Sequence, residues 1–150
     1  MMRFDFRLQQ YLNIKTQLEE QKELEYANAL IMLEREKSKL TDLINQKDSA
    51  IQKLRDSLMS IISPLDVKRA NQTIDKLKQM IIVQENKVAV AAQNAEHKRL
   101  ALIEAMKERK AIETVKENQH AEFLIEVDKK ERARVDELVS FKYANKVELI

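Results

Sequence analysis

The side chains that could carry out chemistry in this sequence are two histidines, His97 and His120, and adjacent acidic pairs such as Glu19 and Glu20. Neither histidine has a second histidine or an acidic cluster at the spacing of metal ligands, so we expect no metal site. Adjacent helical positions do not face each other, so the paired carboxylates are not expected to act as a general acid and base. The absence of cysteine and glycine excludes thiol catalysis and glycine-rich phosphate loops. We therefore expect no enzyme, no catalytic residue, no cofactor and no small-molecule substrate.

Charged residues make up 35% of the chain, and their signs are interleaved along its whole length. Lys and Arg number 27 and Asp and Glu number 25, which leaves a net charge of +2. Even the most basic stretch, residues 128–134, contains acidic residues, whereas a helix that binds nucleic acid concentrates its cations on one face. The pattern is typical of solvated helix surfaces and predicts no nucleic-acid partner.

The elements that position these side chains are predicted to be helices. Of all residues 44% are hydrophobic but only 5% aromatic, and a single proline, Pro64, accompanies the absence of glycine. This composition is typical of long helices and coiled coils. Pro64 must interrupt a helix because proline lacks an amide hydrogen and its ring clashes with the preceding turn. Ser63 and Asp66 on either side are typical of a helix start.

The sequence therefore predicts an all-α fold with a single domain, residues 1–150. A first helix is expected at about 3–62, a turn at about 62–65 and a second helix at about 64–148. The longest apolar runs are far shorter than the roughly 20 residues that span a bilayer, so we expect no transmembrane helix. The first residues lack the apolar core of a signal peptide, which favours a cytoplasmic location.

Apolar residues recur in both helices at alternating steps of three and four, the heptad pattern of a coiled coil. The predicted coiled-coil seam comprises Leu33, Leu40, Ile44, Ile51, Leu54, Leu58, Ile61, Val67, Ala70, Ile74, Leu77, Ile81 and Val88. In an antiparallel pair, facing residue numbers have a constant sum. Pairs such as Leu40 with Val88 and Glu19 with Arg109 give the sum 128, centred on the proline. We therefore expect a long antiparallel two-helix coiled-coil hairpin in this register.

The same register places Phe4 near Phe123 and leaves residues 124–150, which we call the overhang, without a partner in the chain. The predicted hairpin thus has a C-terminal helical overhang, and this segment is amphipathic. Its predicted partner-binding residues are Leu124, Val127, Val135, Leu138, Phe141 and Tyr143. An unpaired apolar stripe of this kind indicates a binding surface.

The sequence also carries recognisable patterns at its two ends. The first is Phe4-x-Phe6-x-Leu8-Gln9-x-x-Leu12-x-x-Lys15, followed by Glu19-Glu20 and a run from Ala27 to Glu36. The second consists of residues 109–117 and of Glu131 followed by Asp136-Glu137-Leu138. These patterns resemble those of the FliJ family, small coiled-coil proteins of the bacterial flagellar type III export apparatus. Ile112 and Val115 stand where the family pattern has leucine.

The resemblance implies a non-enzymatic stalk that inserts its termini into the pore of a hexameric flagellar export ATPase and stimulates it. It further implies contacts with a membrane export gate protein and with export chaperones. The expected location is the cytoplasm, peripherally at the cell membrane beside the flagellar basal body, and the isolated protein is expected to be a monomer. Two alternatives stay open: the stalk subunit of a virulence type III secretion system, and a purely structural coiled-coil tether.

Overall fold

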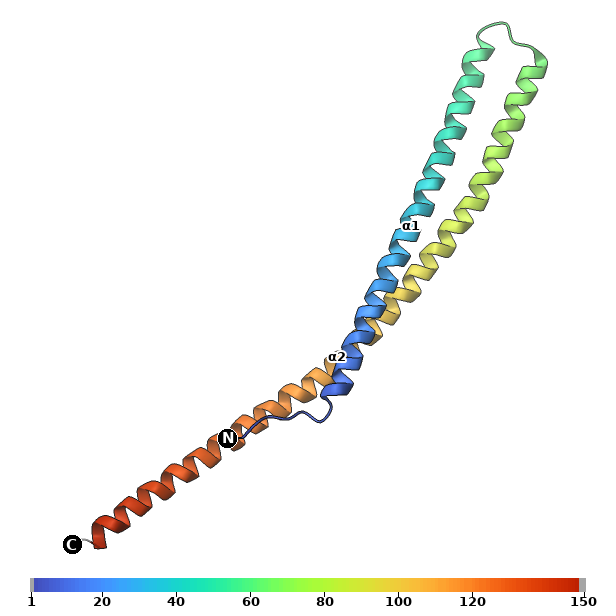
Figure 1. Ribbon diagram of the computed structural model, residues 1–150. Helices are drawn as coiled ribbons and strands as arrows, with labels where there is room; N and C mark the ends of the chain where they lie inside the picture. Colours follow the sequence, from blue (N-terminus) through green and yellow to red (C-terminus); the bar gives the residue numbers. More distant parts are fainter. Residues whose placement is uncertain (1, 149–150) are drawn as a thin grey trace. The chain divides into compact units, whose positions relative to one another are not determined.

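The computed structural model describes residues 2–148, and helices provide all the regular secondary structure in that range. Helix α1 spans Gln9–Leu58 and helix α2 spans Pro64–Glu148 (Figure 1). The two helices pack against each other as a hairpin, which confirms the predicted all-α coiled-coil fold. Leu149 and Ile150, which the predicted overhang includes, lie outside the described residues.

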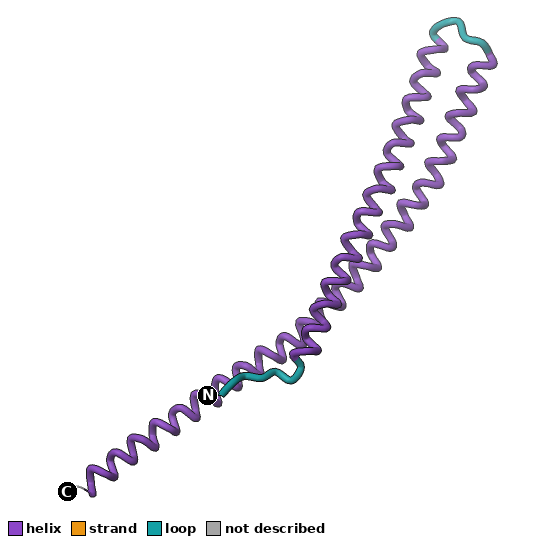
Figure 2. The backbone as a smooth tube through the Cα atoms, viewed as in Figure 1, coloured by secondary structure: helices purple, strands orange, loops and turns teal. Residues whose placement is uncertain are grey.

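The turn between the helices occupies residues 59–63 and appears as a loop in Figure 2. Ser63 caps α2, because its hydroxyl oxygen accepts a hydrogen bond from the Leu65 amide at 3.2 Å. Its carbonyl accepts the amides of Asp66 and Val67 at 3.0 and 3.2 Å. Pro64 thus occupies the first helical position, where its missing amide hydrogen costs nothing.

Helix α1 ends at Leu58, earlier than the expected end near residue 62. Two antiparallel helices lie about 8–10 Å apart, and one residue spans at most about 3.6 Å, so the chain cannot reverse within a residue or two. A proline also disfavours the helical conformation in the residue that precedes it. The seam prediction is therefore wrong at its end: Leu58 is 57% exposed, and Ile61 lies outside the helix and is fully exposed.

Helix α1 also begins later than the expected start near residue 3. Residues 2–8, which we call the strap, precede it without helical structure. The strap ends in a turn that leads into α1, since the Gln9 amide donates to the Phe6 carbonyl oxygen at 3.0 Å.

The packing divides into two compact units along the chain. One unit combines the residues through Glu19 with α2 from Ala105 onward, and the other comprises Glu20–Glu104. In the second unit the seam is buried at Ala29, Ile74, Leu77, Ile81, Gln84, Ala91 and Ala95. The predicted seam residues Leu33, Leu40, Ile44, Ile51, Leu54, Val67, Ala70 and Val88 are half-buried. Two helices alone cannot enclose large side chains completely, so the seam stays partly open to water.

The pairing register of the second unit differs from the predicted one. The Gln84 side-chain amide donates to the carbonyl oxygen of Glu36 at 3.0 Å, and Lys98 pairs with Glu25 at 3.5 Å. Their residue numbers sum to 120 and 123 rather than 128. The last residue of α1, Leu58, and the first residue of α2, Pro64, give a sum of about 122, because the turn is centred near residue 61. The helices are thus offset by about one heptad, and Leu40 with Val88 is not a facing pair.

Candidate partner-binding surface

Most large apolar side chains of the overhang are exposed. Exposed fractions are 52% for Leu124, 49% for Val135, 52% for Leu138, 65% for Phe141 and 72% for Tyr143. Val127 alone among the six predicted binding residues is half-buried. The structure also exposes Ile125, Val139 and Val147, which widen the apolar surface and were absent from the predicted set. Exposed apolar side chains of this kind make the overhang a candidate binding surface.

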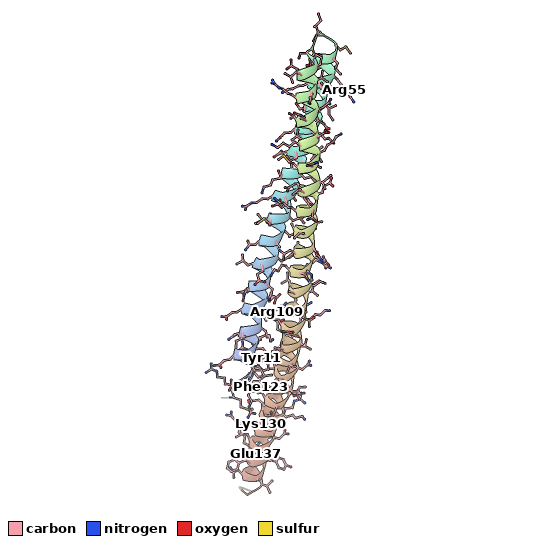
Figure 3. The ribbon with its side chains drawn as sticks, turned by 90° about the vertical axis from the view of Figure 1, so that its right-hand side faces the viewer. Tyr11, Arg55, Arg109, Phe123, Lys130 and Glu137 are labelled. Atoms are coloured by element: carbon pink, nitrogen blue, oxygen red, sulfur yellow. The ribbon has the colours of Figure 1, made fainter. Side chains whose placement is uncertain are left out.

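The face of α2 that would continue the seam is charged in the overhang. Stepping by heptads along the sequence leads from Arg109 through Lys116 to Phe123, and then to Lys130 and Glu137. Figure 3 labels four of these residues along α2. Asp128 forms a salt bridge with Arg132 at 3.3 Å on the same segment. A second helix packed on this face would bury Lys130 and Glu137. Removing these charges from water is costly, so the charges disfavour such a helix. The apolar residues are therefore displaced from the seam and remain available.

The strap closes the hairpin immediately before the overhang. The Phe4 ring packs edge-on against His120 with ring centroids 4.9 Å apart, and against Phe123 at 5.5 Å. Phe6 is buried, and the ammonium of Lys116 lies 6.0 Å from its ring centroid. The predicted neighbours Phe4 and Phe123 are thus in contact, although a non-helical segment brings them together.

Ion pairs hold α1 against α2 next to the strap. Arg109 donates to Glu19 across the seam and to Glu113 along its own helix, the latter at 2.6 Å. Lys15 pairs with Glu108 at 2.9 Å. The hydrogen bonds to Glu19 and Glu113 raise the pKa of Arg109, and the hydrogen bond to Glu108 raises the pKa of Lys15. Both cations therefore stay charged at neutral pH, which suits a structural role rather than proton transfer.

The two ion pairs next to the strap follow different registers. The residue numbers of Glu19 and Arg109 give the expected sum of 128, whereas those of Lys15 and Glu108 give the smaller sum of 123. Long Arg and Glu side chains span the offset of about one helical turn. Glu20 is exposed while Glu19 is half-buried against Arg109, so the two acids do not converge.

The described residues hold no group of three or more metal-binding side chains, and His120 instead stacks in the aromatic cluster of the strap. Within residues 2–148, neither helix contains a stretch apolar and long enough to span a bilayer.

Comparison with known proteins places the chain in a family. The fold is similar to that of CT670 from Chlamydia trachomatis, a YscO homologue, with a TM-score of 0.69 at 20% sequence identity. The similarity covers 94% of this chain and 96% of that one. No curated protein matches the sequence significantly. The family model of the flagellar FliJ protein matches residues 4–148, nearly the whole chain. The chain therefore belongs to the FliJ family, whose members are non-catalytic components of type III protein export.

Proposed function

We propose that the protein is the coiled-coil stalk of a flagellar export ATPase. In this proposal the overhang docks in the pore of the hexameric ATPase and stimulates it. The rest of the hairpin links the ATPase to the membrane export gate and to export chaperones. The protein works by contacts, in the cytoplasm at the base of the flagellum. Membership of the FliJ family supports the class of function, and the exposed apolar surface of the overhang supports the site.

The observation that carries the proposal is the exposure of Leu138 and Phe141. More than half of each residue is exposed among the described residues 2–148. Aromatic anchors that become fully desolvated contribute most of the binding energy at protein interfaces. Together the two residues offer roughly 200 Å² of apolar area, worth up to about 5 kcal/mol on complete burial. Burial of between half and all of this area is worth about 2.5 to 5 kcal/mol of binding free energy, which corresponds to about two to four decades in affinity.

The experiment measures stimulation of the purified ATPase by the full chain. The double variant Leu138→Asp, Phe141→Ala is expected to lose stimulation at concentrations where the wild type saturates. Circular dichroism should show unchanged helicity, because these positions make no seam contact. The matched control is Leu24→Asp, at a residue 64% exposed in the paired region, which should stimulate normally. Full stimulation by the double variant would exclude the overhang from the mechanism.

A second candidate is the stalk of a virulence type III secretion system, and the similarity to a YscO homologue favours it. The two candidates share the mechanism and differ in the machine that contains the stalk. Deleting the gene separates them: loss of motility alone supports the flagellar system, and loss of effector secretion alone supports the virulence system.

A purely structural tether is distinguished by mass in dilute solution. The stalk proposal expects a monomer, because the charged seam face of the overhang disfavours pairing with a second copy. A dimer that persists at all concentrations would support the tether instead.

A further inference from the structure

The turn of the hairpin carries an apolar tip that the coiled coil does not use. We define the tip as Leu58, Met59, Ile61 and Leu65; Met59 and Ile61 are almost fully exposed, and the two leucines are more than half exposed. Chain reversals are normally built from Gly, Asn, Asp, Pro and Ser. Here Ser60, Ser63 and Pro64 form the reversal, and the large apolar residues beside them are left in contact with solvent. Their exposure contributes nothing to the stability of the fold.

Basic residues surround the tip on both helices. Lys53 and Arg55 lie on the last turns of α1, and Lys68 and Arg69 lie on the first turns of α2, all of them exposed. Figure 3 shows Arg55 close to the turn. The tip therefore combines an apolar centre with a cationic rim.

The two acidic residues of the region are already engaged. Asp56 accepts a hydrogen bond from Gln52 at 3.0 Å. Asp66 lies in the first turn of α2, where the helix dipole favours a negative charge. These contacts do not neutralise the carboxylates, so the four basic and two acidic residues between 53 and 69 leave the rim a net charge of +2.

The shape and size of the tip narrow the choice of occupant. Its four side chains expose roughly 500 Å² of area, below the roughly 800 Å² per partner of a stable protein interface. Two copies meeting tip to tip would therefore bury too little. A bilayer surface needs no matching pocket, because apolar side chains enter the boundary between headgroups and acyl chains while cations bind anionic headgroups.

From this arrangement we infer that the tip is a docking site for an anionic lipid bilayer. Met59 and Ile61 enter the interfacial layer, and the rim of Lys53, Arg55, Lys68 and Arg69 binds the anionic headgroups. The attachment is reversible and shallow, since no helix is inserted. The inference goes beyond the proposed function, because the tip and the overhang belong to different units and use different residues.

Flotation of the full chain with large unilamellar vesicles tests the inference. Vesicles of one quarter phosphatidylglycerol in phosphatidylethanolamine should bind the protein, vesicles of phosphatidylcholine should bind it much less, and added salt should weaken binding. The variant Met59→Ser, Ile61→Ser should bind at least about tenfold more weakly, and its helicity should be unchanged because neither residue is helical. The matched control Val139→Ser, Tyr143→Ser removes similarly exposed side chains from the overhang and should bind normally.

Fluorescence provides an independent measurement because the chain contains no tryptophan. The variant Ile61→Trp should show a blue shift on anionic vesicles, whereas Val139→Trp should show none. Stimulation of the ATPase should be retained by Met59→Ser, Ile61→Ser, so failure of this inference leaves the proposed function intact.

Three results would overturn the inference. The first is absence of vesicle binding by the wild type, which would leave a partner protein with a matching pocket as the occupant of the tip. The second is equal binding by the tip variant, or loss of binding in the overhang control. The third is self-association of the wild type that the tip substitutions abolish, which would identify a second copy as the occupant.

Discussion

The burial of Ile81 provides a stringent test of the seam, because its neighbour Ile82 is a matched control. Ile81 is 7% exposed and Ile82 is 66% exposed. Both belong to the same turn of α2, and Ile→Ala changes intrinsic helix propensity by the same amount at each position. The difference between Ile81→Ala and Ile82→Ala in the free energy of unfolding therefore isolates burial against α1.

The expected magnitude follows from these exposures. An isoleucine side chain presents roughly 140 Å² in an extended chain, so the exposure difference corresponds to about 80 Å² of apolar area. At about 25 cal/mol per Å² this area is worth about 2 kcal/mol. A cavity left by incomplete collapse of the seam would raise the cost of Ile81→Ala toward about 4 kcal/mol. Ile82→Ala should change stability by less than about 0.5 kcal/mol, as is usual for exposed positions.

Urea unfolding followed by circular dichroism measures this difference. With a slope of about 2 kcal/mol per M, the unfolding midpoint of Ile81→Ala should lie about 1 M below that of Ile82→Ala. Equal midpoints for the two variants would show that Ile81 does not face α1, and the seam described above would be wrong.

Two further predictions concern the register and its polar contacts. In a chain without native cysteine, Leu40→Cys with Ile81→Cys should form an intramolecular disulfide under mild oxidation, whereas Leu40→Cys with Val88→Cys should not; the opposite result would restore the register centred on the proline. The hydrogen bond from Gln84, aided by Lys39, lowers the pKa of Glu36. The ionised Glu36 therefore contributes stability above the unfolded-state pKa of about 4.3, and this contribution is lost as the pH falls through the lower pKa of the folded state. Between about pH 6 and pH 3, urea midpoints should therefore fall less in Glu36→Gln than in the wild type, and equal falls would contradict this assignment.

The sequence was sufficient to predict two helices in a hairpin, because the heptad pattern and the single proline leave few alternatives. It could not determine the register, because a heptad repeat matches itself again after seven residues. Leu40 paired with Ile81 joins two seam residues as well as Leu40 paired with Val88 does. The choice depends on the turn, whose length is set by the distance that the chain must cross between the helices.

The candidate site was predictable to a similar extent. Amphipathicity indicates Leu138 and Phe141, and both are exposed in the structure. The strap was not predicted, because a helix from residue 3 would also place Phe4 near Phe123. What distinguishes the two conformations is the backbone, since α1 begins only at Gln9.

The strap also has a consequence for the order of events during synthesis. During translation, His120 and Phe123 leave the ribosome about 10 s after Phe4 at ordinary rates. The residues beside the turn meet first, because the loop between them is short and its closure costs little entropy. We therefore expect pairing to proceed from the turn outward and the aromatic contact of the strap to form last.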